Sequence, residues 1–169
     1  AVGAALGVPE RAEALASETR TALATAATRT AQVPEAARKR VLFILSLQGG
    51  RILASGRDTQ AAAIIEMAGG INAVTAFEGY KQLTDEAVAE AAPDVILMMD
   101  RTGDHAILDE QLFAMPAIRI TPAGADEAIV RMNGLYLLGF GPRTASAALD
   151  LNSALYPQRQ ETDNDRDPS

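Results

Sequence analysis

Tyr80 is the residue whose type and setting best suit ligand binding, and it stands in the run Phe77-Glu78-Gly79-Tyr80-Lys81. The run lacks the periodicity of a core segment and contains Gly79, so we expect a loop whose aromatic ring faces solvent or a ligand. A tyrosine phenolate can bind ferric haem iron. An aromatic side chain that only covers the end of a sheet would give the same pattern, so both interpretations stay open.

His105 is the single histidine, and the chain has no cysteine. It follows a predicted strand, beside Asp104, where it could act as a base, bind a metal or haem iron, or be a plain surface residue. Disulfides, iron–sulfur clusters and zinc sites built from several cysteines and histidines are excluded.

Catalytic motifs are missing. Ser46 lacks the GxSxG setting of a hydrolase nucleophile, the carboxylates form no recognisable acid/base pair, and the glycine pairs do not fit a phosphate-binding loop. We therefore expect a binding protein that is not an enzyme, although a small self-contained α/β enzyme remains the alternative from another class.

Glu86 follows Thr84 by two residues, and Thr84 is a good first residue for a helix. An acidic side chain in the first turn is favoured by the helix dipole whether or not it binds a partner. Its role is open on this pattern alone.

Composition narrows the class of protein further. The 169 residues suffice for one well-buried domain, and the formal net charge of −7 argues against nucleic acid as a partner. No apolar run approaches the roughly 20 residues that span a bilayer, so we expect no membrane-spanning segment.

The elements that position these residues alternate between helix and strand. A long helix is predicted from Pro9 to Ala31, with a thin, alanine-rich apolar stripe. The other predicted elements are a buried strand Val41–Leu45, a strand or hairpin arm Ile52–Ala54, a helix capped by Asp58 or Thr59, the Thr84 helix, strand Val95–Met99, a helix around Leu108–Phe113, strands Ala117–Ile120 and Ile129–Met132, and helical Leu135–Tyr156 interrupted near Gly139.

This alternation predicts an α/β fold: a Rossmann-like, mostly parallel sheet with helices on both faces, preceded by the long helix. We divide the chain into 1–38 (the end of a first lobe and the long helix), 39–157 (the α/β lobe) and 158–169 (a polar tail expected to be disordered). Ligands bind such sheets at the carboxyl ends of strands. The ends predicted here are Ser46–Gly50, Asp100–His105 and Thr121–Gly124.

Several segments together resemble the carboxyl-terminal lobe of periplasmic haem-binding proteins of ABC importers, in the cobalamin-binding-like class III family. The resemblance runs from about Ala1 to Pro157. It rests on Leu6–Ala12, Leu45–Arg51, Ile64–Asn72, Glu78–Leu97, Thr121–Gly124 and Leu137–Arg143, with the Leu-Gly-Phe-Gly-Pro-Arg and Gly-Tyr-Lys runs the most specific.

The resemblance implies two similar lobes joined by the long helix, with haem held between them as the transported ligand. This chain would be mainly the second lobe, located in the periplasm, and most of the first lobe would precede Ala1. Tyr80 would then face the cleft, with Tyr80 or His105 near the haem iron, and Glu86 would contact the membrane permease. The other implied ligand-binding residues are Gln48, Arg101, Phe140 and Arg143, and Arg101, Arg119 and Arg143 are the candidates for a propionate.

Two further expectations accompany this resemblance. A corrinoid or a ferric siderophore is the alternative ligand for the same architecture. A lobe without its partner lobe would expose an apolar face, and a homodimer formed through that face is a possible consequence.

Overall fold

The computed structural model describes residues 9–100, 107–139, 141 and 143–157. The elements in chain order are α2 (Pro9–Ala31), a short 3₁₀ helix η1 (Glu35–Ala37), β1 (Arg40–Gln48), β2 (Arg51–Ser55), α3 (Gln60–Met67), β3 (Ile71–Asn72), β4 (Tyr80–Leu83), α4 (Asp85–Ala91), β5 (Val95–Asp100), α5 (Asp109–Phe113), α6 (Pro116–Arg119), α7 (Pro122–Ala125), β6 (Ile129–Asn133), α8 (Gly134–Leu138) and α9 (Thr144–Leu155).

One six-stranded sheet organises the fold, with strand order β4-β2-β1-β5-β6 and β3 paired beside the start of β1. The pairings of β1 with β3, β1 with β5 and β5 with β6 are parallel, whereas β2 pairs antiparallel with both β1 and β4. The predicted mostly parallel α/β sheet is confirmed, with a β1–β2 hairpin and β4 added at one side.

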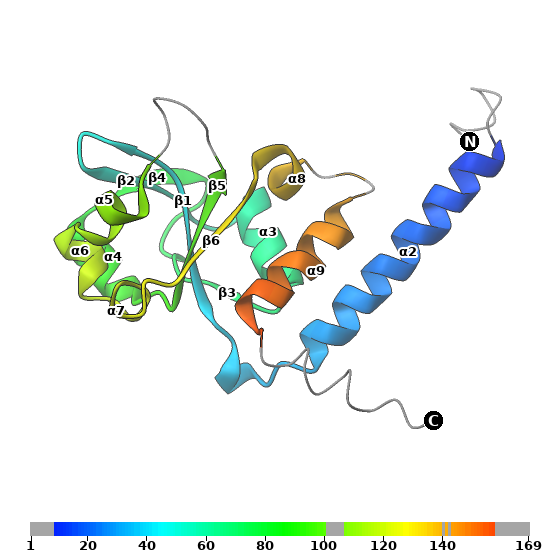
Figure 1. Ribbon diagram of the computed structural model, residues 1–169, viewed down its shortest axis with the longest axis horizontal. Helices are drawn as coiled ribbons and strands as arrows, with labels where there is room; N and C mark the ends of the chain where they lie inside the picture. The colour runs from blue at the N-terminus through cyan, green and yellow to red at the C-terminus, as the bar shows by residue number, and fades with distance from the viewer. Residues whose placement is uncertain (1–8, 101–106, 140, 142, 158–169) are drawn as a thin grey trace.

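Alternate residues of the central strands enter two separate cores, because successive side chains of a strand point to opposite faces. Val41, Phe43 and Leu97 pack under α3, α8 and α9, while Leu42, Ile44 and Ile96 pack under α4, α5, α6 and α7. Figure 1 shows these two helical layers on either side of the sheet. The central strands are therefore buried on both faces, as their continuous apolar runs predict.

Helix α2 begins and ends at the residues predicted for it, Pro9 and Ala31. Its carboxyl-terminal half lies against the lobe: Ala26 is buried, the Thr30 hydroxyl donates to the Met67 carbonyl at 2.6 Å, and the Arg29 guanidinium lies 3.4 Å from the Ser153 hydroxyl. The amino-terminal half runs on past α9 and away from the sheet (Figure 1). This course suits a helix that connects the lobe to another body.

Two helix starts have the caps that their sequences predict. The hydroxyl of Thr59 accepts from the Ala62 N–H at the start of α3, and the hydroxyl of Thr84 accepts from the Ala87 N–H at the start of α4. Of the two caps proposed for α3, Thr59 is the correct one.

Two predicted elements are wrong. Ala117–Ile120, predicted as a strand, belongs mostly to helix α6, which has Pro116 at its first position. Tyr80, predicted in a loop, begins strand β4, where it pairs with Ser55 of β2. The short, mostly polar run from Tyr80 to Leu83 is a strand because β2 offers it a free edge, which local sequence cannot reveal.

Candidate functional site

The carboxyl ends of β1, β5 and β6 form one edge of the sheet, which we call the carboxyl edge. Gln48 is the last residue of β1 and pairs with Arg51 across the tip of the β1–β2 hairpin, while Asp100 and Asn133 pair at the ends of β5 and β6. Gln48 is exposed there, at the end of the strand rather than in the predicted loop. Its position fits the predicted ligand-facing edge.

Glu86 lies near the same edge. Strand β4 ends at Leu83, opposite Ile52 beside the hairpin tip, and α4 begins immediately afterwards. Glu86 is exposed, and hydrogen bonds from its own backbone N–H and from the Thr84 side chain lower the pKa of its carboxyl group. The side chain is therefore a fixed negative charge at neutral pH, at the start of a helix.

Tyr80 has a different setting from the one predicted. Its ring lies edge-on against the buried ring of Phe43, with 6.4 Å between the ring centroids. The side chain is half-buried and packs against the core under α3, three residues before the end of β4. This packing favours a structural role, whereas ligation of haem iron by Tyr80 stays a prediction.

Arg143 stands directly before α9 and is exposed. Its guanidinium carbon lies 6.0 Å from the centre of the Tyr136 ring, in cation–π geometry. The Tyr136 hydroxyl donates to Asp150 Oδ2 at 2.7 Å. Burial, the hydrogen bond to Asp150 and the Asp150 charge raise the pKa of Tyr136 to about 12, so Tyr136 is a neutral donor at physiological pH.

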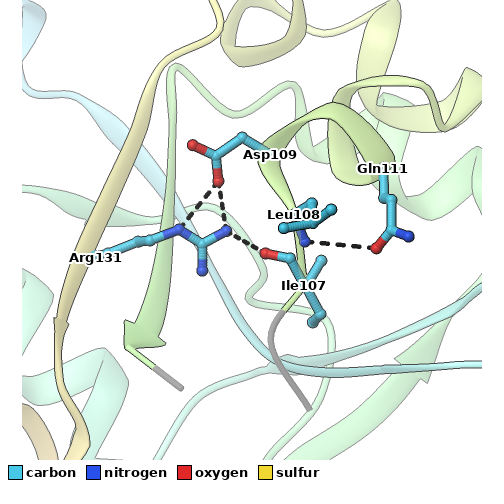
Figure 2. A network of polar contacts seen from close by, with 5 residues as sticks. All are labelled: Ile107, Leu108, Asp109, Gln111 and Arg131. Carbon is cyan, nitrogen blue, oxygen red and sulfur yellow. Dashed lines mark hydrogen bonds and ion pairs between the residues drawn. The ribbon is translucent and has the colours of Figure 1, made fainter. Parts of the chain in front are cut away.

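Arg131 makes a polar network that the sequence does not suggest (Figure 2). From β6, its Nε donates to Asp109 Oδ1 at 3.0 Å, and its Nη2 donates to the same oxygen and to the Ile107 carbonyl at 2.6 Å. The Gln111 side chain adds a weaker bond from the Leu108 N–H at 3.5 Å. The network joins the start of α5 to the edge strand β6.

Three predicted ligand-binding residues, Arg101, His105 and Phe140, lie outside the residues that the structure describes. The predicted ligand-facing position of Thr121–Gly124 is wrong. These residues belong to the start of α7, where the Ala123 N–H donates to the Pro93 carbonyl at 2.8 Å, ahead of β5. They therefore lie at the opposite, amino end of the parallel strands, and Arg119 at the end of α6 lies with them.

Two features of the described residues bear on the class of site. None of their helices is long and apolar enough to cross a membrane. In the same ranges, no group of three or more histidine, aspartate or glutamate side chains is arranged to hold a metal ion.

The arrangement is that of an α/β lobe with exposed polar side chains at the carboxyl edge and a long helix leading away from it. The family described as periplasmic binding protein matches residues 1–134, and the chain belongs to this family. Its members bind ligands and are not enzymes, and membership implies a location outside the cytoplasm.

Solved structures show which periplasmic binding proteins this chain resembles. The haem-binding protein BhuT in complex with two haems is 39% identical and superposes with a TM-score of 0.83 over 92% of this chain. RhuT from Roseiflexus sp. RS-1, in apo form, is 35% identical with a TM-score of 0.81, and a haem-binding protein from Pseudomonas aeruginosa is 32% identical with a TM-score of 0.75, each over 92% of this chain. No curated protein sequence matched.

The chain spans only part of these relatives: it covers 59% of BhuT, 59% of RhuT and 57% of the Pseudomonas aeruginosa protein. What the whole protein binds and which partners it meets are therefore proposals.

Proposed function

We propose that this chain is the larger part of a haem-binding protein of an ABC importer, which holds haem between two lobes and delivers it to a membrane permease. The observation that carries the proposal is the similarity to BhuT and RhuT, both described as periplasmic haem-binding proteins, at 39% and 35% identity over 92% of the chain. We place the protein in the periplasm on the same ground.

In this proposal the described residues form the second lobe, and α2 connects it to the first. The projection of the amino-terminal half of α2 away from the sheet supports a bridging role. The boundaries 1–38, 39–157 and 158–169 are part of the proposal, and the first eight and the last twelve residues lie outside the described part of the chain.

Haem would lie against the carboxyl edge. Gln48 and Arg143 offer polar contacts, and Leu135 of α8 offers an apolar surface, since 82% of it is exposed just after β6 ends. Arg101, His105 and Phe140 belong to the proposed site on sequence grounds. We assign Tyr80 a structural role in this site. Whether its hydroxyl also binds the haem iron is tested by the spectrum of Tyr80→Phe.

Glu86 is the proposed permease contact. Its exposure beside the hairpin tip and its lowered pKa supply a stable negative charge near the carboxyl edge. A basic surface on the permease would be the complementary partner.

The test is a titration of the complete gene product containing this chain with ferric haem, followed by the Soret band. We expect a saturable shift of the Soret band away from its position in free haem, and a different position for His105→Ala if the histidine binds the iron. Absence of any saturable change in the Soret band, with tight binding of a corrinoid or a ferric siderophore instead, would replace haem by that ligand and overturn the proposal.

Self-association of the lobe is a separate expectation that the comparisons do not support. It rests on the expectation that a lobe without its partner lobe exposes an apolar face, and Leu135 is an exposed apolar residue just after β6. Size-exclusion chromatography with light scattering checks it, and a monomeric mass at every concentration would contradict it.

A further inference from the structure

The arginine side chains near the carboxyl edge differ in their contacts within the protein. Arg131 is held by Asp109 and the Ile107 carbonyl, and Arg51 lies 3.4 Å from the Gln82 amide oxygen. Arg143 has no carboxylate within ion-pair distance among the residues described, and its guanidinium faces the Tyr136 ring. Its charge and its donors are therefore available to a ligand.

The nearest acid on the same helix, Asp150, is kept from neutralising Arg143. Asp150 follows Arg143 by seven positions in the sequence, which is about 10 Å along a helix. Tyr136 occupies the space between them, with its hydroxyl bonded to Asp150 and its ring beside the guanidinium. The acid thus fixes the tyrosine instead of the arginine.

Tyr136 is itself held from two further sides. The Asn133 side chain accepts from the Tyr136 backbone N–H at 3.1 Å, which caps α8, and the Tyr136 ring packs against the core under α9. A ring held in this way restricts the orientations of the guanidinium that faces it, because the planar cation gains most over an aromatic face.

We propose that Tyr136, fixed by Asp150, is a positioning residue that holds Arg143 ready to bind a carboxylate of the ligand. This inference rests on the proposed function, in which the carboxylate is a haem propionate. Arg143 is preferred to Arg119 because Arg119 lies at the amino end of the strands, beside α7. A preoriented, permanently charged guanidinium suits bidentate binding of a carboxylate.

The experiment compares two ligands in the complete gene product: ferric protoporphyrin IX and its dimethyl ester, in which both carboxylates are masked. Arg143→Ala should weaken binding of the free acid about tenfold or more and leave the ester within about twofold, since a charged hydrogen bond is lost only with the acid. Arg119→Ala is the matched control and should change neither affinity.

Tyr136 is tested by two variants and a double-mutant cycle. Tyr136→Leu should weaken binding of the free acid about two- to fivefold with little effect on the ester, and should add almost nothing in the Arg143→Ala background. Tyr136→Phe keeps the ring and loses the hydroxyl bonds to Asp150 and Ser146, so it should have a smaller effect of the same selectivity. Because this variant disturbs the packing least, it also separates the effect on binding from a folding defect.

The outcomes separate the two proposals. If the unaltered protein causes no saturable change in the Soret band of haem, the proposed function fails. If it binds haem but Arg143→Ala affects acid and ester equally, or neither, the inference fails while the function stands. If Arg143→Ala is selective and Tyr136→Leu is not, the positioning role of Tyr136 is wrong.

Discussion

The rings of Tyr80 and Phe43 meet edge to face, with their planes at 66° and their centroids 6.4 Å apart. Phe43 is completely buried in β1, and Tyr80 covers it from β4, so the contact joins the peripheral strand to the central sheet. Tyr80→Ala should lower the free energy of unfolding by about 2 kcal/mol, since it removes aromatic burial and the ring pair. Tyr80→Phe should stay within about 0.5 kcal/mol of the unaltered protein. Denaturant unfolding measures both.

The same Tyr80→Phe variant decides whether the hydroxyl binds haem iron. Because the ring packs on Phe43, we expect an unchanged Soret band and unchanged charge-transfer bands in the haem-loaded protein. A clear spectral shift in Tyr80→Phe, with stability intact, would instead establish the phenolate as an iron ligand.

Gly124 marks a close approach between two helices. A Cβ atom at this position would overlap the carbonyl of Ile118, where the end of α6 meets α7. Gly124→Ala should therefore cost about 1–3 kcal/mol of stability through local overpacking. Gly141→Ala is the control, because the nearest atom to its added Cβ would be 3.7 Å away. Equal stabilities for the two variants, measured by thermal or denaturant unfolding, would contradict this account.

Asn72 is a buried amide that joins the segment after β3 to the segment after β2. Its Nδ2 donates to the Gly56 carbonyl at 3.0 Å and to the Val74 carbonyl at 2.9 Å, and only 5% of the residue is exposed. Asn72→Ala should cost about 2 kcal/mol, because both carbonyls lose a donor away from water. Asn72→Asp should cost more at pH 7, since a carboxylate facing two carbonyls cannot donate. Gln82→Glu, an exposed amide-to-acid change, controls for the added charge.

Helix starts and central strands were predictable from sequence because their signals are local. Pro9 begins α2, Thr59 and Thr84 cap their helices through their own side chains, and the apolar runs of β1 and β5 require burial on both faces. The same logic should have identified α6, where Pro116 also stands at the first helical position. The run Ala117-Ile118-Arg119-Ile120 is predicted as a strand instead, because a run this short fits both the helical and the strand period.

The site was less predictable, because its interactions join distant parts of the chain. Arg131 meets Asp109 across 22 residues, and Tyr136 meets Asp150 across 14. Neither pair has a spacing that a motif would reveal. The only local hint is an arginine inside the apolar strand β6, which signals that a buried or half-buried charge needs a partner. Gln48 lies at the carboxyl edge, where the sequence predicts a ligand-facing residue, although β1 ends at Gln48 rather than at Leu45. Its contact with a ligand stays a prediction.

The Glu86 carboxylate gives a stability test with a definite pH dependence. Hydrogen bonds from its own N–H and from Thr84 lower its pKa below the ordinary value of 4.5, so folding favours the ionised form. The stabilisation is fully present above about pH 4.5 and is lost as the pH falls through the lowered pKa of the folded state. The difference in unfolding free energy between the unaltered protein and Glu86→Gln should therefore be present at pH 7 and shrink as the pH falls below 4.5 through the lowered pKa of the folded state. Glu90→Gln, in the last turn of the same helix, should show no loss at pH 7, because the helix dipole disfavours an acid there. If both variants follow the same pH profile, general charge repulsion explains the effect and the Glu86 hydrogen bonds do not.

The same Glu86→Gln variant tests the proposed permease contact. A protein that keeps its haem affinity but loses permease-dependent haem uptake would assign the Glu86 charge to that contact, since haem binding and transport are measured independently of stability.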